Sequence, residues 1–170
     1  MKNKKVLIGV LSLIFAFTII GWSKILSIQM QRNCTGYLKR AADANTVETA
    51  KDQLHKAIAY LEENNLTKGY TSAIYNTPDE DIAFWFNNLK SSEQELDKVI
   101  NSKTSSSTET SNVLMKLRET LIDNGEKGDH LTVPDGLSRF PNNLVWGIFR
   151  ILAYGVVIIC GLYIYIKLEE

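Results

Sequence analysis

Two long apolar stretches bracket the chain and dominate its hydropathy pattern. The first, Val6 to Trp22, carries no charge, and the second, Leu144 to Ile166, carries only Arg150. A helix needs about 20 apolar residues to cross the hydrocarbon core of a bilayer, and both stretches approach or reach that length. The pattern therefore predicts transmembrane helices over residues 6–24 and 143–166, with a polar region between them.

The N-terminal stretch has the features of an anchor rather than of a cleaved leader. A basic segment, residues 1–5, precedes it, as in a signal peptide. The apolar run is longer than a typical signal core, and no small-x-small cleavage motif follows Gly21. Trp22 and Lys24 follow instead, as is typical of the interfacial end of a span. We expect an uncleaved signal-anchor.

The charges next to the two spans favour one orientation. The positive-inside rule places the tails, residues 1–5 and 167–170, in the cytoplasm and residues 25–142 on the opposite side. Lys24 and Arg32 lie just beyond the first span and weaken this asymmetry. The sequence thus predicts a two-pass membrane protein with cytoplasmic termini, and leaves the reverse orientation open.

Aromatic residues mark the expected membrane interfaces. In two antiparallel spans, Trp22 and Trp146 face one interface, and Tyr163 and Tyr165 mark the other. Arg150 lies four residues, about one helical turn, inside Trp146. Its long side chain could reach the surface by snorkelling, or it could meet an acidic group of a partner span or a lipid phosphate.

Between the spans, apolar residues recur at helical spacing in several segments. The first span is expected to continue outward as one helix to about Ala44. A second helix follows, with Asn45 as its N-cap and Glu48 three residues later, and residues 62–65 end it. Its predicted apolar face comprises Val47, Ala50, Leu54, Ala57 or Ile58, and Leu61.

A third helix has the strongest start signal in the chain. Thr77 can act as N-cap, Pro78 suits the first helical position, and Glu80 completes a capping box. The helix is expected to run to about Ile100, with Phe84 outside its apolar face. That face comprises Ile82, Trp85, Phe86, Leu89, Leu96, and Val99 or Ile100.

The remainder of the middle region completes a helical domain. Residues 102–111 form a low-complexity polar linker, and a further helix with Gly125 as its C-cap follows. Residues 133–136 are predicted to form a turn that leads towards the second span. No strand of useful length is expected here. The predicted fold is all-α, with two transmembrane helices flanking an extramembrane bundle of about four segments.

Residues 66–76 form an unusually long connection for a compact domain. The segment carries Tyr70, Ile74 and Tyr75, which are large for a solvated loop. It either packs on its own side chains or binds something. The candidate interaction residues are Tyr70, Ile74, Tyr75, Phe84 and Trp85. The alternative is an aromatic pocket near residues 70–86, lined by Tyr70, Tyr75, Trp85 and Phe86.

Charge and cysteine content narrow the functional classes. The chain has 19 basic and 19 acidic residues, of which 13 and 17 fall between Ile25 and Asn142. A mildly acidic middle region argues against nucleic-acid binding, which needs a basic face. Cys34 and Cys160 lie at different depths, so an intramolecular disulfide is not expected. Cys34 is left as either a buried thiol or a partner in an intermolecular disulfide.

The sequence contains no recognisable catalytic, metal-binding or cofactor-binding motif. There is no glycine-rich phosphate loop, paired-cysteine site or HExxH motif. His55 falls on a solvated helix face. Asp129 and His130 form the best remaining candidate for a metal site or proton relay, and a weak one. We therefore expect a protein that is not an enzyme.

Two functions remain as expectations. The first is an accessory subunit that presents a helical extracytoplasmic domain to a partner complex, either a membrane protein or a second copy of the chain. The second is a ligand-binding or sensing module that takes a small molecule and signals through a partner's spans. In both cases the bilayer itself is a partner.

Overall fold

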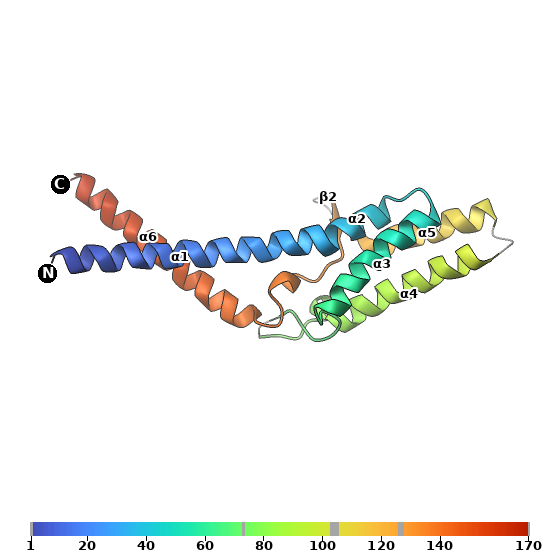
Figure 1. The fold of residues 1–170 in the computed structure, drawn as a ribbon, viewed down its shortest axis with the longest axis horizontal. Coiled ribbons are helices and arrows are strands. Elements are labelled where there is room, and N and C mark those ends of the chain that lie inside the picture. Colours follow the sequence, from blue (N-terminus) through green and yellow to red (C-terminus); the bar gives the residue numbers. More distant parts are fainter. Residues whose placement is uncertain (1, 73, 103–105, 126–127, 170) are drawn as a thin grey trace.

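The computed structural model describes residues 2–72, 74–102, 106–125 and 128–169, and side chains within residues 9–123 and 128–163 of these ranges. The molecule is elongated (Figure 1). Two long apolar helices, α1 (Lys2–Met30) and α6 (Asn143–Glu169), cross at one end, and shorter helices pack into a bundle at the other. The predicted all-α architecture is confirmed.

The first span continues without a break into the bundle, as predicted. A π-helical turn, Gln31–Thr35, joins α1 to α2 (Gly36–Ala42). A Cβ atom at Gly36 would lie 2.7 Å from the carbonyl oxygen of Gln31. The wide turn therefore fits here because residue 36 has no side chain.

The N-cap of helix α3 (Val47–Glu63) lies one residue later than predicted. Thr46, not Asn45, is the N-cap, and its hydroxyl accepts a hydrogen bond from the backbone N–H of Thr49 at 3.2 Å. Thr46 has the extended backbone that an N-cap requires. At the C-terminal end, Asn65 adopts a φ of 57°, and the N–H of Leu66 donates to the carbonyl of Leu61 at 2.8 Å. This is a Schellman ending, with the buried Leu66 as its apolar contact.

The capping box predicted at Thr77 is wrong in detail. Pro78–Glu80 form a short 3-10 turn, and the Thr77 hydroxyl donates to the Glu80 carboxylate at 2.6 Å rather than capping a helix. The helix α4 (Ile82–Asn101) starts after this turn. Asp81 caps it, because its extended backbone lets the carboxylate accept from the N–H groups of residues 83 and 84.

The linker predicted over residues 102–111 is shorter than expected. The helix α5 (Ser107–Leu121) includes residues 107–111, and residues 103–105 lie outside the described part of the chain. The Ser106 hydroxyl accepts from the N–H of Glu109 at 3.1 Å. A serine-rich composition suggested a linker, but serine is also among the best N-cap residues.

A small antiparallel hairpin of two four-residue strands follows α5, where no strand of useful length was expected. The strands β1 (Ile122–Gly125) and β2 (Gly128–Leu131) pair with Asp123 opposite His130. Gly125 therefore ends a strand and is not a helix C-cap. The helix stops earlier because Ile122 takes an extended conformation (φ −122°, ψ 124°), which suits its β-branched side chain.

A turn is present before the second span, one residue later than predicted, over residues 134–137. The N–H of Leu137 donates to the carbonyl of Pro134 at 3.3 Å, and Gly136 has a φ of 82°. This left-handed conformation is the reason for glycine at the third position of the turn. A 3-10 turn, Leu137–Arg139, then leads into α6.

One apolar core holds the bundle together. The predicted faces of α3 and α4 are buried, and α2 and α5 pack against them. Phe84 points out of this core, as its position outside the apolar face of α4 predicted. The fully buried side chains include Leu38, Leu54, Ile58, Leu61, Ile82, Leu89, Leu96 and Leu121.

Candidate functional site

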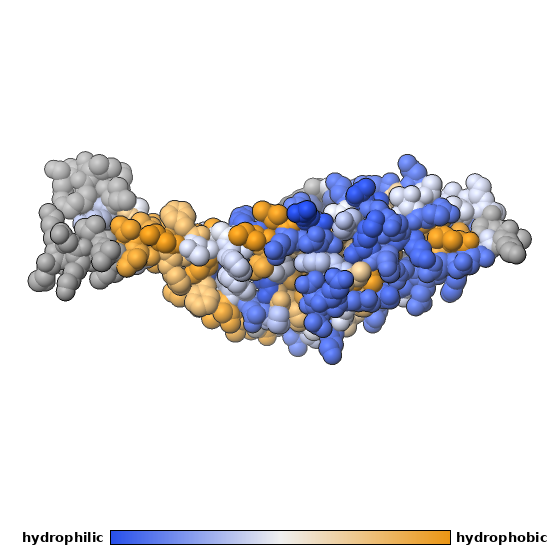
Figure 2. All heavy atoms as spheres, in the orientation of Figure 1, coloured by the Kyte–Doolittle hydropathy of each residue, from blue (hydrophilic) through white to orange (hydrophobic). Residues whose placement is uncertain are grey.

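The first functional region is the pair of apolar helices. The segments Gly9–Ala42 and Asn143–Tyr163 are each long and apolar enough to cross a membrane. The helices meet through small residues, since Ala16 on α1 and Ala153 on α6 are both buried at their contact. Around this contact most of the large apolar side chains point outward, and Figure 2 shows the apolar surface next to the polar surface of the bundle.

The positions of Trp22 and Trp146 can be compared by their distances from the point where α1 and α6 cross. Trp146 lies seven residues from Ala153, and Trp22 lies six residues from Ala16, both on the bundle side. At 1.5 Å per residue, these separations correspond to about 9 and about 10.5 Å along the two helices. The two tryptophans therefore lie at similar distances from the crossing, on the same side of it.

The other predicted interface residues are placed as follows. Tyr163 is exposed on the opposite side of the helix crossing, and the side chain of Tyr165 lies outside the described part. Arg150 is half-buried and forms no ion pair among the described residues. Its position, one turn beyond Trp146, is compatible with the snorkelling interpretation.

The structure divides the candidate interaction residues between two places. Tyr70, Ile74 and Tyr75 are exposed on the loop that follows α3, and none of them lines the groove at the start of α4. Phe84 and Trp85 do line that groove, from the first turn of α4. The pocket expected from Tyr70, Tyr75, Trp85 and Phe86 shares only Trp85 with it.

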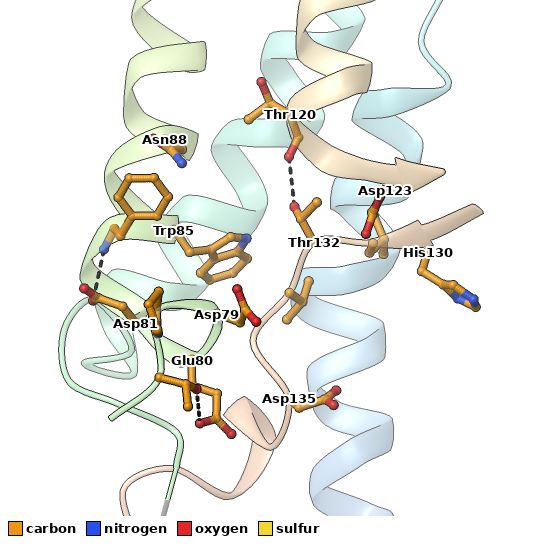
Figure 3. Close-up of a pocket in the computed structure, with 15 residues that line it drawn as sticks. Asp79, Glu80, Asp81, Trp85, Asn88, Thr120, Asp123, His130, Thr132 and Asp135 are labelled. Atoms are coloured by element: carbon orange, nitrogen blue, oxygen red, sulfur yellow. Dashed lines mark hydrogen bonds between the residues drawn. The ribbon is translucent and has the colours of Figure 1, made fainter. Parts of the chain in front are cut away.

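This groove, of about 920 Å³, lies between the start of α4 and the segment that follows the hairpin (Figure 3). Local hydrogen bonds build both walls. On one side, Asp81 fixes the start of α4 by capping it. On the other side, the Thr132 hydroxyl donates to the carbonyl of Thr120 at 2.9 Å and ties the chain to the end of α5.

The groove is strongly acidic. Asp79, Glu80, Asp81, Asp123 and Asp135 line it, and no lysine or arginine is among its lining residues. Glu80 and Asp81 are engaged by the hydrogen bonds described above. Among the described interactions, Asp79, Asp123 and Asp135 have no hydrogen-bond or ion-pair partner. These three carboxylates are available to a cationic group.

Trp85 forms the floor of the groove next to these acids. Its side chain is about nine-tenths buried, and its Nε1–H has no hydrogen-bond partner among the described residues. In Figure 3 the indole nitrogen points towards Thr132 across the groove. An unpaired buried donor is costly, so this position favours a bound water or the acceptor atom of a ligand.

A charged network joins α3 to α4 away from the groove. His55 Nδ1 lies 2.7 Å from Glu93 Oε1, and Lys90 donates to the other carboxylate oxygen at 3.0 Å. Burial alone would raise the pKa of Glu93, but the hydrogen bonds from His55 and Lys90 outweigh it and lower this pKa below its ordinary value. The hydrogen bond to Glu93 in turn raises the pKa of Lys90.

The two histidines lie in different parts of the domain, His55 on α3 and His130 on β2. His55 is exposed, as predicted, and its contact with Glu93 connects two helices. His130 lines the groove, while its neighbour Asp129 pairs with Arg118 at 3.2 Å. Among the described residues, no group of three or more histidine, cysteine or acidic side chains is arranged to hold a metal ion. Cys34 is completely buried, which disfavours an intermolecular disulfide.

Comparison with known proteins gives no family for this chain, because no family model, curated protein or solved structure matches it. The candidate sites therefore depend on geometry alone. The groove was missed at the level of sequence, since its walls come from segments about 40 residues apart. The only local signal for it was the run of three acids, Asp79 to Asp81.

Proposed function

We propose that the chain is a non-enzymatic, two-span membrane protein that presents its helical domain outside the cytoplasm to a partner complex. The observation that carries this proposal is the contrast between the two ends of the molecule. The bundle has a continuous buried core, whereas α1 and α6 leave most of their large apolar side chains uncovered. Lipid would cover these side chains at little cost, and water would not.

The face offered to the partner is the acidic groove. Asp79, Asp123 and Asp135 have no hydrogen-bond or ion-pair partner within the described part of the chain, so they can pair with lysine or arginine side chains of another protein. Phe84, whose side chain is 65% exposed, adds an apolar contact at the rim. Aromatic anchors surrounded by charges are typical of protein interaction sites.

The test is recovery of the tagged full-length chain from native membranes after mild chemical cross-linking. We expect a membrane protein to co-purify at fixed stoichiometry, and the triple variant Asp79→Asn/Asp123→Asn/Asp135→Asn to lose it. The matched control is Glu48→Gln/Glu63→Gln/Glu119→Gln, which neutralises three exposed acids outside the groove. Recovery of a lone monomer, or equal loss with both triple variants, would contradict the proposal.

A second candidate function is a small-molecule sensor that acts through a partner's spans. The unpaired Nε1–H of Trp85 favours it, because a ligand acceptor atom could satisfy this donor while an amine meets the acids. A screen of cationic metabolites should then find one that raises the melting temperature. Trp85→Phe should abolish this shift while preserving helicity, and an undiminished shift would argue against the assignment.

A further inference from the structure

The loop that follows α3 holds large apolar side chains away from the rest of the domain. We call Leu66–Ser72 together with Ile74–Asn76 the tip loop. Within it, the side chains of Ile74 and Tyr75 are 77% and 74% exposed, and Tyr70 is also exposed. Isolated apolar residues on a surface are common, but several on one loop usually mark a contact with something else.

The base of the tip loop is fixed, so these side chains are held outward by structure. The N–H of Thr71 donates to the carbonyl of Glu80 at 3.1 Å, and the N–H of Ile82 donates to the carbonyl of Gly69 at 2.9 Å. The N–H of Tyr75 donates to the Ser72 hydroxyl at 3.0 Å. These backbone groups are thus satisfied locally while the apolar side chains face outward.

The tip loop lies beside the first turn of α6. The Asn143 side-chain amide donates to the carbonyl of Thr71 at 2.6 Å, and Asn143 is the first residue of that helix. Gly69 also packs against the ring of Phe140, since a Cβ at this glycine would lie 2.8 Å from a ring carbon. Figure 1 shows the loop running next to the start of α6.

From this position we propose that Ile74 and Tyr75, with Tyr70, insert into the interfacial layer of the bilayer that α1 and α6 span. The inference rests on the membrane anchoring proposed above. Leu144 and Val145, in the first turn of α6 beside this loop, are also exposed apolar residues. Trp146, the next residue, is the one expected at the headgroup level.

The chemistry of the loop fits the interface rather than the hydrocarbon core. Irregular backbone facing lipid does not occur within the core, because its polar groups would lack partners. Tyrosine combines an apolar ring with a hydroxyl that prefers the headgroup region. Lys68 is exposed nearby, with no ion pair among the described residues, and can meet lipid phosphates. Together with the two spans, the tip loop would form a third attachment that fixes the tilt of the bundle.

The experiment measures the depth of a nitroxide label in full-length protein reconstituted in phosphatidylcholine/phosphatidylglycerol nanodiscs. Labels are placed at Ile74→Cys, at Thr108→Cys on the distal end of α5, and at Ile151→Cys on the exposed face of α6. Cys160→Ala provides the background, and the buried Cys34 is retained. Power saturation compares the accessibility of each label to oxygen and to a water-soluble nickel complex. Circular dichroism confirms that each variant is folded.

We expect the label at 74 to be several-fold more accessible to oxygen, relative to nickel, than the label at 108, and less so than the label at 151. If the label at 151 has the high oxygen accessibility of a lipid-exposed site while the label at 74 behaves like the label at 108, the interfacial insertion is wrong. In that case the membrane anchoring stands. If label 151 is aqueous, the anchoring itself fails. If label 74 is shielded from both reagents, the loop is covered by protein and the inference is overturned.

Discussion

Glu93 shows how a single side chain couples two helices. Its carboxylate lies at the interface between α3 and α4, where His55 and Lys90 hold it ionised. Because the pKa of Glu93 is lower in the folded state than in the unfolded chain, its stabilisation is present at neutral pH. It is lost as the pH falls below the ordinary glutamate value of about 4.3 and through the lower, folded-state pKa.

Replacing Glu93 with Gln should therefore lower the free energy of unfolding by about 1–2 kcal/mol at neutral pH. The difference should shrink as the pH falls from about 5 to 3, because the wild-type carboxylate becomes protonated there. Thermal melting in detergent, followed by circular dichroism across this range, measures the effect. Glu63→Gln, on the exposed end of α3, is the control. A difference that does not vary with pH would exclude the charge as the cause.

Gly36 is a second position where one residue decides local geometry. A methyl group there would collide with the Gln31 carbonyl in the π-helical turn. We expect Gly36→Ala to destabilise the protein by about 1–3 kcal/mol, as overpacking does, although alanine favours helices in general. Gly21→Ala is the matched control, since nothing lies within 4 Å of a Cβ at that position. A melting temperature at least as high as that of the control would contradict this role.

At the scale of elements, the contact between α1 and α6 depends on small residues. Ala16 and Ala153 are buried where the two helices cross, and close approach of backbones is the usual basis of packing between helices in lipid. Trp22 and Trp146 lie at similar distances from this contact, on its bundle side.

Enlarging this contact should separate the helices. We expect Ala16→Leu to lower the melting temperature of the protein in nanodiscs, because the added side chain has no space at the crossing. Val10→Leu adds volume to an exposed position of the same helix and should be nearly neutral. Equal effects of the two substitutions would show that the spans do not pack through Ala16.

At the scale of the whole molecule, α1 leads towards the bundle and α6 leads back from it. The start of α1 and the end of α6 therefore lie at the same end of the molecule, far from the bundle (Figure 1). The orientation proposed from the flanking lysines places that end in the cytoplasm. The charges of the bundle and its groove would then face partners outside.

A single labelling experiment distinguishes the two orientations. In intact cells, a membrane-impermeant maleimide should modify Thr108→Cys, which is exposed at the distal end of the bundle. The native Cys34 should remain unmodified, because it is buried. Labelling that requires permeabilised cells would reverse the proposed orientation and place the domain in the cytoplasm.

The sequence by itself determined the two apolar helices, the buried faces of α3 and α4 and the turn at Gly136. These features follow from hydropathy, helical periodicity and the φ preference of glycine, all of which act over a few residues. The exact helix starts were less certain because several adjacent residues can cap. In the structure the N-caps are Thr46, Asp81 and Ser106, and each of them has the extended backbone that an N-cap requires.

Only the tertiary structure decided the sites. The acidic groove joins α4 to the segment after the hairpin, and the hydrogen bond between Asn143 and Thr71 joins residues 72 positions apart. Such contacts depend on how whole elements pack, and no local pattern encodes which distant residue will be met. The side chains that face lipid, water or a partner are therefore assigned by the packed molecule, after local chemistry has defined its helices.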